Sequence, residues 1–352
     1  MIKTDNLKID SQEEMITPKE LKQKYKAEIV AEHIDSSRKI ISDIINWKDN
    51  RLLVISWPCS IHNTEEWLEY ARKLAELKEK FPELFIVMRT YFEKPRTTVW
   101  WEWLISDPEL NWSFNIDLWL EKARNFLLEI NKLWLATATE FLEPLTTQYI
   151  ADLVSWWAIG ARTTESQTHR HMASGLSMPI GFKNATSGDI NIARDAIISS
   201  KNPHNFLWIN NDWCLRKIKT KWNPDSHLIL RWGKSWPNYK KEDIAKASEI
   251  LENAWIETWI IIDASHANSN KDHTRQKIVC EDIAKQMQEW NKKIVWIMLE
   301  SNLVEWNQKF NPLTDDKQNL TCWVSITDAC INLEQTEEIL DMMNKANKKR
   351  NS

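Results

Sequence analysis

Short apolar runs alternate with amphipathic stretches along most of this chain. The apolar runs have the length of buried strands, and the stretches between them carry the apolar spacing of helices. The predicted strands are residues 52–56, 85–89, 135–140, 158–161, 179–183, 227–231, 259–263 and 294–300. The predicted helices are residues 65–80, 119–132, 147–154, 190–199, 241–253 and 272–289.

This alternation predicts an α/β fold with a parallel sheet, because parallel strands need a crossover connection, usually a helix, between them. Eight such units in 352 residues favour a closed (β/α)₈ TIM barrel. The alternative is an open, doubly wound sheet. No Gly-x-Gly-x-x-Gly sequence follows the first predicted strand, even if tryptophans are counted as glycines, which argues against a dinucleotide-binding sheet.

Both ends of the chain lie outside this alternation. Residues 1–45 predict an N-terminal arm with helical and extended parts, in which Thr17 and Pro18 mark the start of a helix. Residues 46–345 form the predicted barrel, with the alternating strands and helices. Residues 346–352 predict a frayed basic tail, since they are mostly lysine, arginine and asparagine.

One insertion interrupts the barrel before its sixth strand. Two short apolar runs, residues 206–210 and 215–220, flank the turn-like residues 211–213. Such a pattern is typical of a β-hairpin. We therefore expect an inserted hairpin at about residues 205–221.

The contents of tryptophan and glycine are inverted relative to an average protein. The chain has 22 tryptophans and 5 glycines, whereas glycine is normally about 7% of residues. Several tryptophans stand where a turn favours glycine: Trp47, Trp57, Trp222 and Trp232. We hypothesise that most of these tryptophans are glycines in the native protein, for example through a UGA codon that the source reads as glycine. The alternative is a tryptophan-rich protein with an aromatic binding face.

Charge and cysteine content narrow the functional class. The formal net charge of −4 gives no indication of nucleic-acid binding. No apolar run reaches the roughly 18 residues of a membrane span, and residues 1–10 are polar and unlike a signal peptide. The 5 cysteines form no Cys-x-x-Cys pair, which fits a reducing cytoplasm.

Cationic side chains follow several of the predicted strands. Active sites of (β/α)₈ barrels lie at the C-terminal ends of the strands, so side chains there converge. The cations at these positions are Arg89, Lys94, Arg96, Arg162, Lys183 and Arg231. Any one of them alone is more simply a surface salt-bridge partner. Together they predict anionic ligands, with more than one phosphate and a carboxylate.

A second group at the same ends can bind a metal. Cys59, His266, Glu300 and Asp328 follow strands one, seven and eight or lie in the last loop. A thiolate, an imidazole and two carboxylates suit a divalent transition ion, which can polarise a carbonyl oxygen. The alternative for Cys59 is an ordinary buried cysteine. Asp263 and Glu140 also stand at strand ends.

Several motifs around these residues resemble one enzyme family. They are Trp57-Pro-Cys-Ser-Ile-His62, Arg89-Thr-Tyr-Phe-Glu-Lys-Pro-Arg-Thr-Thr-Val-Trp-Trp101, Trp157-Ala-Ile-Gly-Ala-Arg-Thr-Thr-Glu-Ser166, Gly181-Phe-Lys-Asn184, Arg231-Trp-Gly-Lys234, Asp263-Ala-Ser-His-Ala-Asn-Ser269 and Ser325-Ile-Thr-Asp-Ala-Cys330. Together they resemble the class I 3-deoxy-D-arabino-heptulosonate 7-phosphate (DAHP) synthases with a short N-terminal arm. The resemblance covers about residues 15 to 340. Trp101 and Trp156 match tryptophans of the family, whereas most other tryptophans fall on family glycines.

The resemblance implies the first step of the shikimate pathway to aromatic amino acids. Phosphoenolpyruvate and erythrose 4-phosphate condense with water and release phosphate. It also implies a divalent metal ion (Mn, Fe, Co or Zn) held by Cys59, His266, Glu300 and Asp328.

The resemblance also assigns the residues that hold the substrates. Arg162, Arg231 and the backbone of Ala161 match the site of the phosphoenolpyruvate phosphate, and Arg89 and Lys183 match its carboxylate site. Glu140 lines that side of the pocket. Arg96 and Thr97 match the phosphate site of erythrose 4-phosphate, and Lys94 reaches both substrates. Lys94 or Asp328 would move the proton on the new alkoxide, and His266 belongs to the reacting centre.

Family members with this arm and hairpin are usually inhibited by an aromatic amino acid, at a site formed by the arm, Ser177 and the hairpin. The alternative is that the arm and the hairpin only build the interface of a homodimer or homotetramer.

Three rival functions remain at this point. One is the sister synthase that uses arabinose 5-phosphate, against which the sequence Lys94-Pro-Arg-Thr-Thr98 argues. Another is a non-catalytic sensor of phosphate ligands on the same barrel, against which the complete metal set argues. The third, an inactive product, applies only if tryptophan is truly incorporated, because overpacking costs roughly 1–3 kcal/mol at each site.

Overall fold

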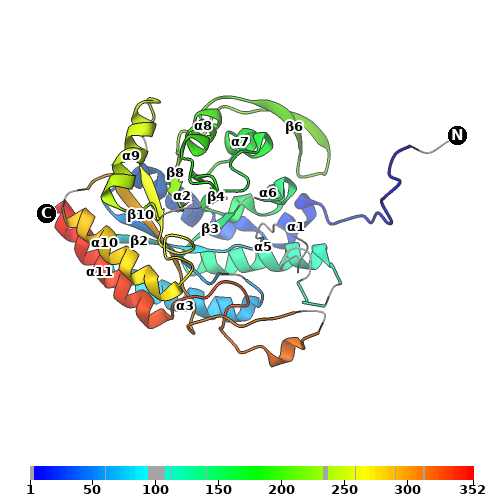
Figure 1. The fold of residues 1–352 in the computed structure, drawn as a ribbon. Helices are drawn as coiled ribbons and strands as arrows, with labels where there is room; N and C mark the ends of the chain where they lie inside the picture. Colours follow the sequence, from blue (N-terminus) through cyan, green and yellow to red (C-terminus); the bar gives the residue numbers. More distant parts are fainter. Residues whose placement is uncertain are drawn as a thin grey trace.

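Eight parallel strands close into a barrel in the computed structural model (Figure 1). The structure describes residues 4–59, 61–93, 108–111, 113–140, 142–232, 237–257, 259–289, 291–311 and 314–352. The barrel strands are β1 (Leu52–Trp57), β2 (Leu84–Arg89), β3 (Ala136–Glu140), β4 (Trp156–Ile159), β5 (Ile180–Lys183), β8 (Ser226–Leu230), β9 (Ile260–Asp263) and β10 (Ile294–Glu300). The predicted (β/α)₈ barrel is thereby confirmed.

The strands follow one another around the barrel in chain order, and β10 pairs with β1 to close it. At this closure Leu53 lies opposite Trp296 and Trp57 lies opposite Glu300, in parallel register. A closed parallel sheet has no open edge, so every strand is paired on both sides.

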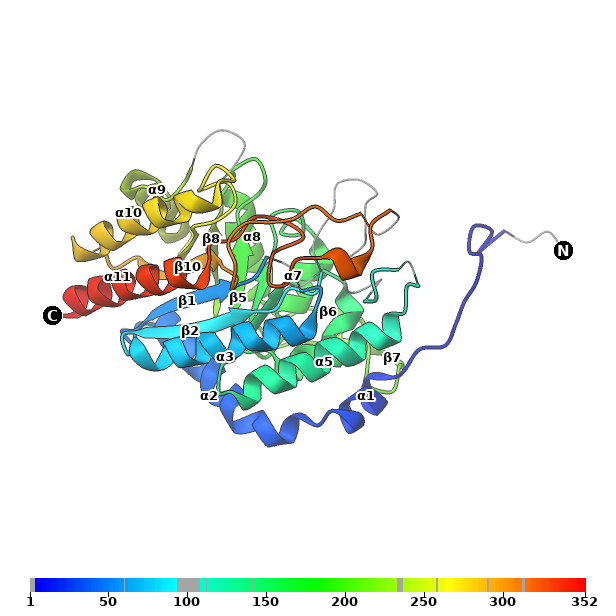
Figure 2. The ribbon, with the colours of Figure 1, turned by 90° about the horizontal axis from the view of Figure 1, so that it is seen from below.

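Helices cover the outside of the barrel, as Figures 1 and 2 show. They are α3 (Thr64–Lys80), α5 (Ile116–Lys132), α6 (Thr147–Ile150), α7 (Gln167–Ala173), α8 (Asn191–Ser200), α9 (Lys241–Glu252), α10 (Gln276–Gln288) and α11 (Leu333–Asn351). Each predicted helix has a counterpart among them. The sequence analysis did not predict α7 or α11.

Several predicted boundaries differ from the structure, among them the start of α5, at Ile116, and the start of α10, at Gln276. Strand β4 starts two residues before its predicted range, since Trp156 pairs with Ala138 and Trp157 with Thr139 in the ladder to β3. The predicted helix over residues 147–154 is α6 followed by a 3₁₀ turn at Ala151–Leu153.

The core has an inner and an outer part. Alternate strand residues point into the barrel, among them Ile55, Ala138, Trp156, Ile229 and Met298, and these are buried against one another. The opposite faces of the strands pack under the surrounding helices in a second, larger cluster. Burial of both strand faces explains why the strands are continuous apolar runs and not alternating ones.

The N-terminal arm holds α1 (Pro18–Lys24) and α2 (Ala31–Ile45). Thr17 caps α1 through a reciprocal pair of bonds with Glu20, and Pro18 is the first helical residue, as the sequence predicts. Helix α2 packs Ile41 and Ile44 against the inner barrel cluster. Residues 4–14 are exposed and extend away from the body in both ribbon views (Figures 1 and 2).

The inserted hairpin is present as predicted. Strands β6 (Asn205–Ile209) and β7 (Leu215–Lys219) form an antiparallel pair outside the barrel. Its tip contacts the arm, since the Lys19 N–H donates to the Asn211 carbonyl at 2.9 Å and the Trp213 indole N–H donates to the Ile16 carbonyl at 3.3 Å.

The prediction of a frayed C-terminal tail is wrong. Residues up to Asn351 continue α11, with Asn347 and Arg350 buried. The Asn347 amide donates to the carbonyls of Asn50 and Glu83, at 2.9 and 3.0 Å, and Arg350 donates to the Ile294 carbonyl. These acceptors lie at the starts of β1, β2 and β10. The last turns of α11 therefore hydrogen-bond to the N-terminal end of the barrel.

Tryptophans occupy many of the left-handed backbone positions. Of the thirteen non-glycine residues with positive φ in the described part of the chain, seven are tryptophan: Trp47, Trp134, Trp213, Trp232, Trp255, Trp306 and Trp323. Bulky L-residues rarely adopt this region, which glycine enters freely.

No helix among the described residues is long and apolar enough to cross a bilayer.

Candidate active site

The predicted site residues gather at the C-terminal end of the barrel. Strands β2, β3, β5 and β10 end in Arg89, Glu140, Lys183 and Glu300, Arg231 follows β8, and Cys59, Ala161, Arg162 and His266 lie two or three residues beyond β1, β4 and β9. Asp328 lies in the loop before α11. Lys94, Arg96, Thr97 and Lys234 lie outside the described residues.

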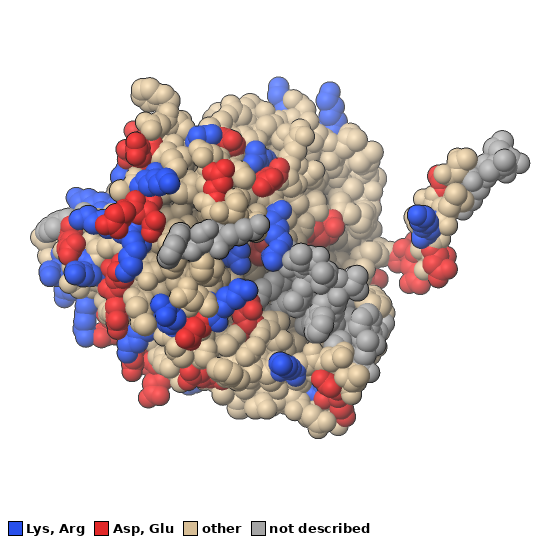
Figure 3. Space-filling model, viewed as in Figure 1, with Lys and Arg blue, Asp and Glu red and all other residues tan. Residues whose placement is uncertain are grey.

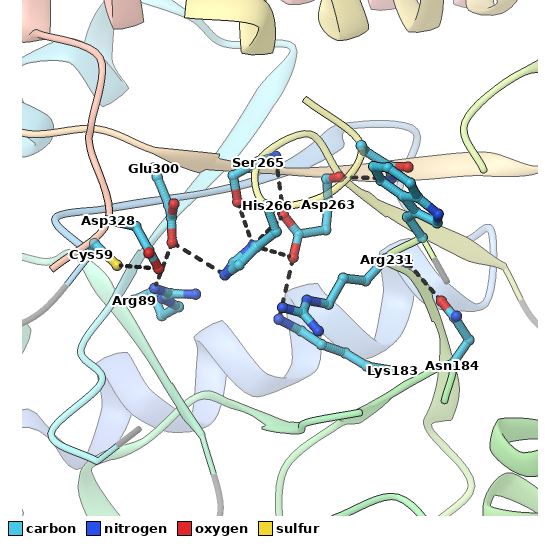
Figure 4. A network of polar contacts seen from close by, with 12 residues as sticks. Cys59, Arg89, Lys183, Asn184, Arg231, Asp263, Ser265, His266, Glu300 and Asp328 are labelled. Atoms are coloured by element: carbon cyan, nitrogen blue, oxygen red, sulfur yellow. Dashed lines mark hydrogen bonds and ion pairs between the residues drawn. The ribbon is translucent and has the colours of Figure 1, made fainter. Parts of the chain in front are cut away.

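Three of the predicted metal ligands lie together. Donor atoms of Cys59, Glu300 and Asp328 are all within 4.8 Å of one another, and the Cys59 thiol lies 3.4 Å from Asp328 Oδ2 (Figure 4). Cys59 and Glu300 are buried, whereas Asp328 is exposed. A thiol and two carboxylates at these separations can converge on one divalent ion.

His266 borders this group through Glu300. Its Nε2 atom lies 3.3 Å from Glu300 Oε1, and that oxygen is buried with no hydrogen bond from any described residue. A buried anionic oxygen without a hydrogen bond is costly unless a cation offsets its charge. The group of Cys59, Glu300 and Asp328 therefore fits a divalent metal ion, and the His266 imidazole lies beside it.

The His266 backbone has φ of 56°. Histidine enters the left-handed region more often than most residues, and such conformations cluster at functional sites. Here the turn carries the imidazole from the end of β9 toward Glu300 on β10 (Figure 4).

Arg89 lies between two aromatic rings. Its guanidinium carbon is 3.4 Å from the centre of the Trp57 ring and 3.7 Å from that of Tyr91, and Nη2 lies 3.7 Å from Glu300 Oε1. Nε and Nη2 have no hydrogen-bond acceptor among the described residues. Buried guanidinium donors without acceptors are suited to an anionic ligand.

Lys183 and Arg231 approach from neighbouring strands (Figure 4). The Lys183 ammonium is buried and lies 3.2 Å from Asp263 Oδ2. Burial lowers the pKa of Lys183, while the charge of Asp263 opposes that shift. The Arg231 N–H donates to the Asn184 side-chain oxygen at 2.7 Å, which fixes the backbone where the arginine leaves β8.

Glu140 and the loop after β4 form the adjoining wall. A Cβ atom placed on Gly160 would lie 2.1 Å from Glu140 Oε1, so any larger residue here would displace the carboxylate. Ala161 is buried and Arg162 is exposed. The exposed Arg162 follows two residues after Gly160, whose backbone lies beside the Glu140 carboxylate.

Comparison with known proteins identifies the family. The DAHP synthetase I family model matches residues 13–341. The chain belongs to this family.

Relatives in the DAHP synthetase I family match nearly the whole chain. The "Phospho-2-dehydro-3-deoxyheptonate aldolase, Tyr-sensitive" of Escherichia coli (strain K12) is 46% identical over 338 residues, which cover 96% of this chain and 94% of that protein. The Trp-sensitive aldolase of Salmonella typhimurium (strain LT2) is 47% identical over 345 residues, covering 97% and 98%.

A solved structure agrees with this membership. The phospho-2-dehydro-3-deoxyheptonate aldolase of Francisella tularensis SCHU S4 superposes with a TM-score of 0.94 at 44% identity, covering 97% of this chain and 99% of that one. The resemblance to DAHP synthases and the barrel fold are therefore both confirmed.

Some residues at this DAHP synthase site were not given a role from the sequence. Tyr91 and Asn184 lie within motifs that were recognised, but their contacts with Arg89 and Arg231 became visible only in the structure. Asp263 was noted only as the end of a strand. Asp263 pairs with Lys183 and with His266. The order of the strands around the barrel could be predicted from the sequence, but these side-chain contacts could not.

Proposed function

We propose that this chain condenses phosphoenolpyruvate with erythrose 4-phosphate and water, giving DAHP and inorganic phosphate. The observation that carries the proposal is the metal-competent group of Cys59, Glu300 and Asp328 at the same barrel end as the buried cations Arg89 and Lys183. Membership of the DAHP synthetase I family supports the same reaction.

We assign the metal to Cys59, His266, Glu300 and Asp328, with Mn, Fe, Co and Zn as the possible ions. When bound, a divalent ion draws electron density from the aldehyde oxygen of erythrose 4-phosphate and makes its carbon more electrophilic. Glu300 is held for this role by Gln276, whose side-chain oxygen accepts the Glu300 N–H at 2.8 Å and whose amide donates to the Glu300 carbonyl at 2.9 Å.

The cations orient the substrates. Arg89 and Lys183 would bind the carboxylate of phosphoenolpyruvate, and Arg231, Arg162 and the Ala161 backbone would bind its phosphate. The two substrates are both anions and repel each other in solution. When the cations hold them in contact, their reaction becomes a unimolecular step within one complex.

The reaction then needs one water, whose two protons are balanced by one proton taken up by the new alkoxide and one that leaves with the phosphate. C3 of phosphoenolpyruvate attacks the aldehyde carbon, water adds at C2, and phosphate leaves as the C2–O bond breaks. The new alkoxide takes a proton, for which Lys94 and Asp328 are the candidates. Asp328 is exposed and is in contact with Cys59, so it can exchange protons with solvent.

The deciding experiment follows phosphoenolpyruvate loss by metal-free protein, before and after addition of Mn²⁺. The chain would be used both as isolated from its source and with glycine at the anomalous tryptophans. Turnover restored by Mn²⁺ with erythrose 4-phosphate is expected. Turnover only with arabinose 5-phosphate would indicate the sister synthase, and binding without turnover by a folded chain would indicate the sensor.

Feedback control is the second part of the proposal. Two relatives are named Tyr-sensitive and Trp-sensitive, and we propose that an aromatic amino acid inhibits this chain near Ser177 and the hairpin. Ser177 is exposed close to Ser174, whose hydroxyl contacts that of Thr220 at 2.6 Å just beyond β7. The arm meets the other end of the hairpin, at Trp213.

The test of feedback is inhibition by tyrosine, phenylalanine and tryptophan, each compared with Ser177→Leu. Relief of inhibition in the variant, with unchanged kcat, is expected. If none of the three inhibits, the arm and hairpin serve assembly alone.

We also propose a homodimer or homotetramer in the cytoplasm. Leu207 and Leu215 of the hairpin are 69% and 65% exposed, and the surface over α7 and β6 carries few charged side chains (Figure 3, upper right). Apolar surface of this kind suits a subunit contact. Sedimentation of Leu207→Lys against the unmodified chain tests it, with a smaller species expected.

A further inference from the structure

Asp263 is a fully buried carboxylate between the two halves of the site. It ends β9, and no part of it is exposed. Oδ2 lies 3.2 Å from the Lys183 ammonium and 3.1 Å from His266 Nδ1. A charge taken out of water in this way must be paired and hydrogen-bonded to be tolerated.

The other oxygen is satisfied locally. Asp263 Oδ1 accepts the Ser265 N–H at 3.1 Å and the Ser265 hydroxyl at 2.7 Å. The turn that follows is fastened as well, since the Asn268 amide donates to the Asp263 carbonyl at 2.9 Å. Both carboxylate oxygens are therefore fixed, and the side chain has no freedom to turn away from its partners (Figure 4).

The contact with His266 determines which nitrogen faces the metal ligands. Nδ1 is directed at Asp263 and the Ser265 hydroxyl, the latter at 2.7 Å. Nε2 consequently faces Glu300 Oε1, at 3.3 Å. A proton held on Nδ1 by a carboxylate leaves the Nε2 lone pair available to a metal, and such partners orient the ring.

The contact with Lys183 supplies the counter-charge of a buried ammonium. Lys183 is 4% exposed, and the nearby cations Arg231 and Arg89 act against its charge. Asp263 is the carboxylate in direct contact with it among the described residues. Without that partner the ammonium would lose its position and the nearer of the two carboxylate charges, Asp263 and Glu140, that favour its protonated form.

We propose that Asp263 is a positioning residue that holds the metal ligand His266 and the anion-binding Lys183 with one carboxylate. It thereby fixes the distance between the metal site and the carboxylate site of phosphoenolpyruvate. This role rests on the proposed function, in which the site binds a metal ion and phosphoenolpyruvate. The affinity for each of these ligands can be measured at equilibrium, without turnover.

The test is the variant Asp263→Asn in the full chain, with binding measured separately for each partner. Mn²⁺ affinity, followed by the EPR signal of free Mn²⁺, is expected to fall about 10-fold to 100-fold, as for other carboxylates behind a ligand histidine. Phosphoenolpyruvate affinity, measured by calorimetry on metal-free protein, is expected to fall about tenfold because a charged hydrogen-bond partner of Lys183 is lost.

Two controls separate positioning from general destabilisation. Asp152→Asn removes a carboxylate that lies away from the site and pairs with Arg124 at a distance of 2.7 Å. This variant is expected to change thermal stability without changing the affinity for Mn²⁺ or for phosphoenolpyruvate. Ser265→Ala removes the hydroxyl that lies near His266 Nδ1 and donates to Asp263 Oδ1, but it leaves the contact between Asp263 and Lys183 in place. It is expected to weaken Mn²⁺ binding by a few-fold, with phosphoenolpyruvate binding unchanged. If Asp263→Asn does not fold, Ser265→Ala carries the metal half of the test.

Unchanged Mn²⁺ affinity in folded Asp263→Asn, or in Ser265→Ala if the former does not fold, would overturn the role toward His266. Unchanged or tighter phosphoenolpyruvate binding would overturn the role toward Lys183. Failure of the proposed reaction looks different: the unmodified chain would bind Mn²⁺ and phosphoenolpyruvate, lose both in Asp263→Asn, and still give no product with erythrose 4-phosphate.

Discussion

Tryptophan stands at backbone positions that its side chain disfavours. Trp306 has φ of 92° and Trp134 has φ of 55°, and both are 62% exposed, so little burial offsets the cost of the conformation. Trp156, which matches a family tryptophan, is different: its indole N–H donates to His227 Nε2 at 3.0 Å. The buried indoles of Trp57 and Trp296 find no such acceptor among the described residues.

The first prediction follows from this contrast. Peptide mass spectrometry of the protein isolated from its source is expected to find glycine at positions such as Trp47, Trp57 and Trp306, and tryptophan at Trp156. Glycine relieves the positive φ at Trp47 and Trp306 and removes the ring stacked on Arg89 at Trp57. Tryptophan in the peptides covering these three positions would refute the glycine hypothesis.

Among the elements, the join between arm and barrel depends on one arginine. Arg124 of α5 is fully buried and donates to the Tyr25 and Tyr149 carbonyls, at 2.9 and 2.7 Å, and to Asp152 at 2.7 and 2.8 Å. These bonds link the residue after α1 to the elements around α6.

The second prediction concerns this link. Arg124→Met keeps most of the apolar stem but leaves two carbonyls and a carboxylate without their donor, so urea unfolding is expected to show a loss of about 3 kcal/mol. Arg194→Met, at a partly exposed arginine on α8 that pairs with Asp195, is the matched control and should change stability by less than about 0.5 kcal/mol. Equal losses in the two variants would mean that the buried network contributes nothing specific.

The third prediction concerns pH and the barrel interior. Burial lowers the pKa of His227, on β8, and of His62 to about 3. Because the folded pKa lies below the unfolded value of 6.5, these groups add stability that is complete above pH 6.5 and is lost as the pH falls toward 3. The urea midpoint is expected to decrease across this range.

In His227→Gln, glutamine keeps an acceptor for the Trp156 indole but does not titrate. The decrease should therefore be shallower, with the part due to His62 remaining. A slope identical to that of the unmodified chain would show that His227 is not the group being protonated.

The strands were predictable from the sequence because a buried parallel strand is a continuous apolar run, as in residues 294–300. The end of α11 was predicted as a solvated tail because its residues are polar and basic. The carbonyl groups that accept from Asn347 and Arg350 lie at the starts of β2 and β10, and the sequence does not show these contacts. The site residues were predictable because they stand at or just after the C-terminal ends of the predicted strands. The bond between Asp263 and Lys183 depends on side-chain directions, which apolar patterns do not specify.

At the scale of the whole molecule, the N-terminal residues contribute little to the fold. Residues 4–14 are exposed and extend from the body (Figure 2), whereas the contacts of the arm with the barrel begin at Met15 and Ile16. The fourth prediction is that removal of residues 1–14 changes the free energy of unfolding by less than about 0.5 kcal/mol. Limited proteolysis should cut there first, and a truncated chain that unfolds much more easily would contradict this.

The pairing of Leu53 with Trp296 also has a consequence during synthesis. Until residues near 300 leave the ribosome, β1 has only β2 as a neighbour, and its other edge is open. Contacts between such distant residues form slowly, and an unpaired apolar edge can recruit other nascent chains. The strand pair that leaves the finished barrel without an edge therefore leaves the growing polypeptide with one exposed apolar strand edge until β10 has been synthesised.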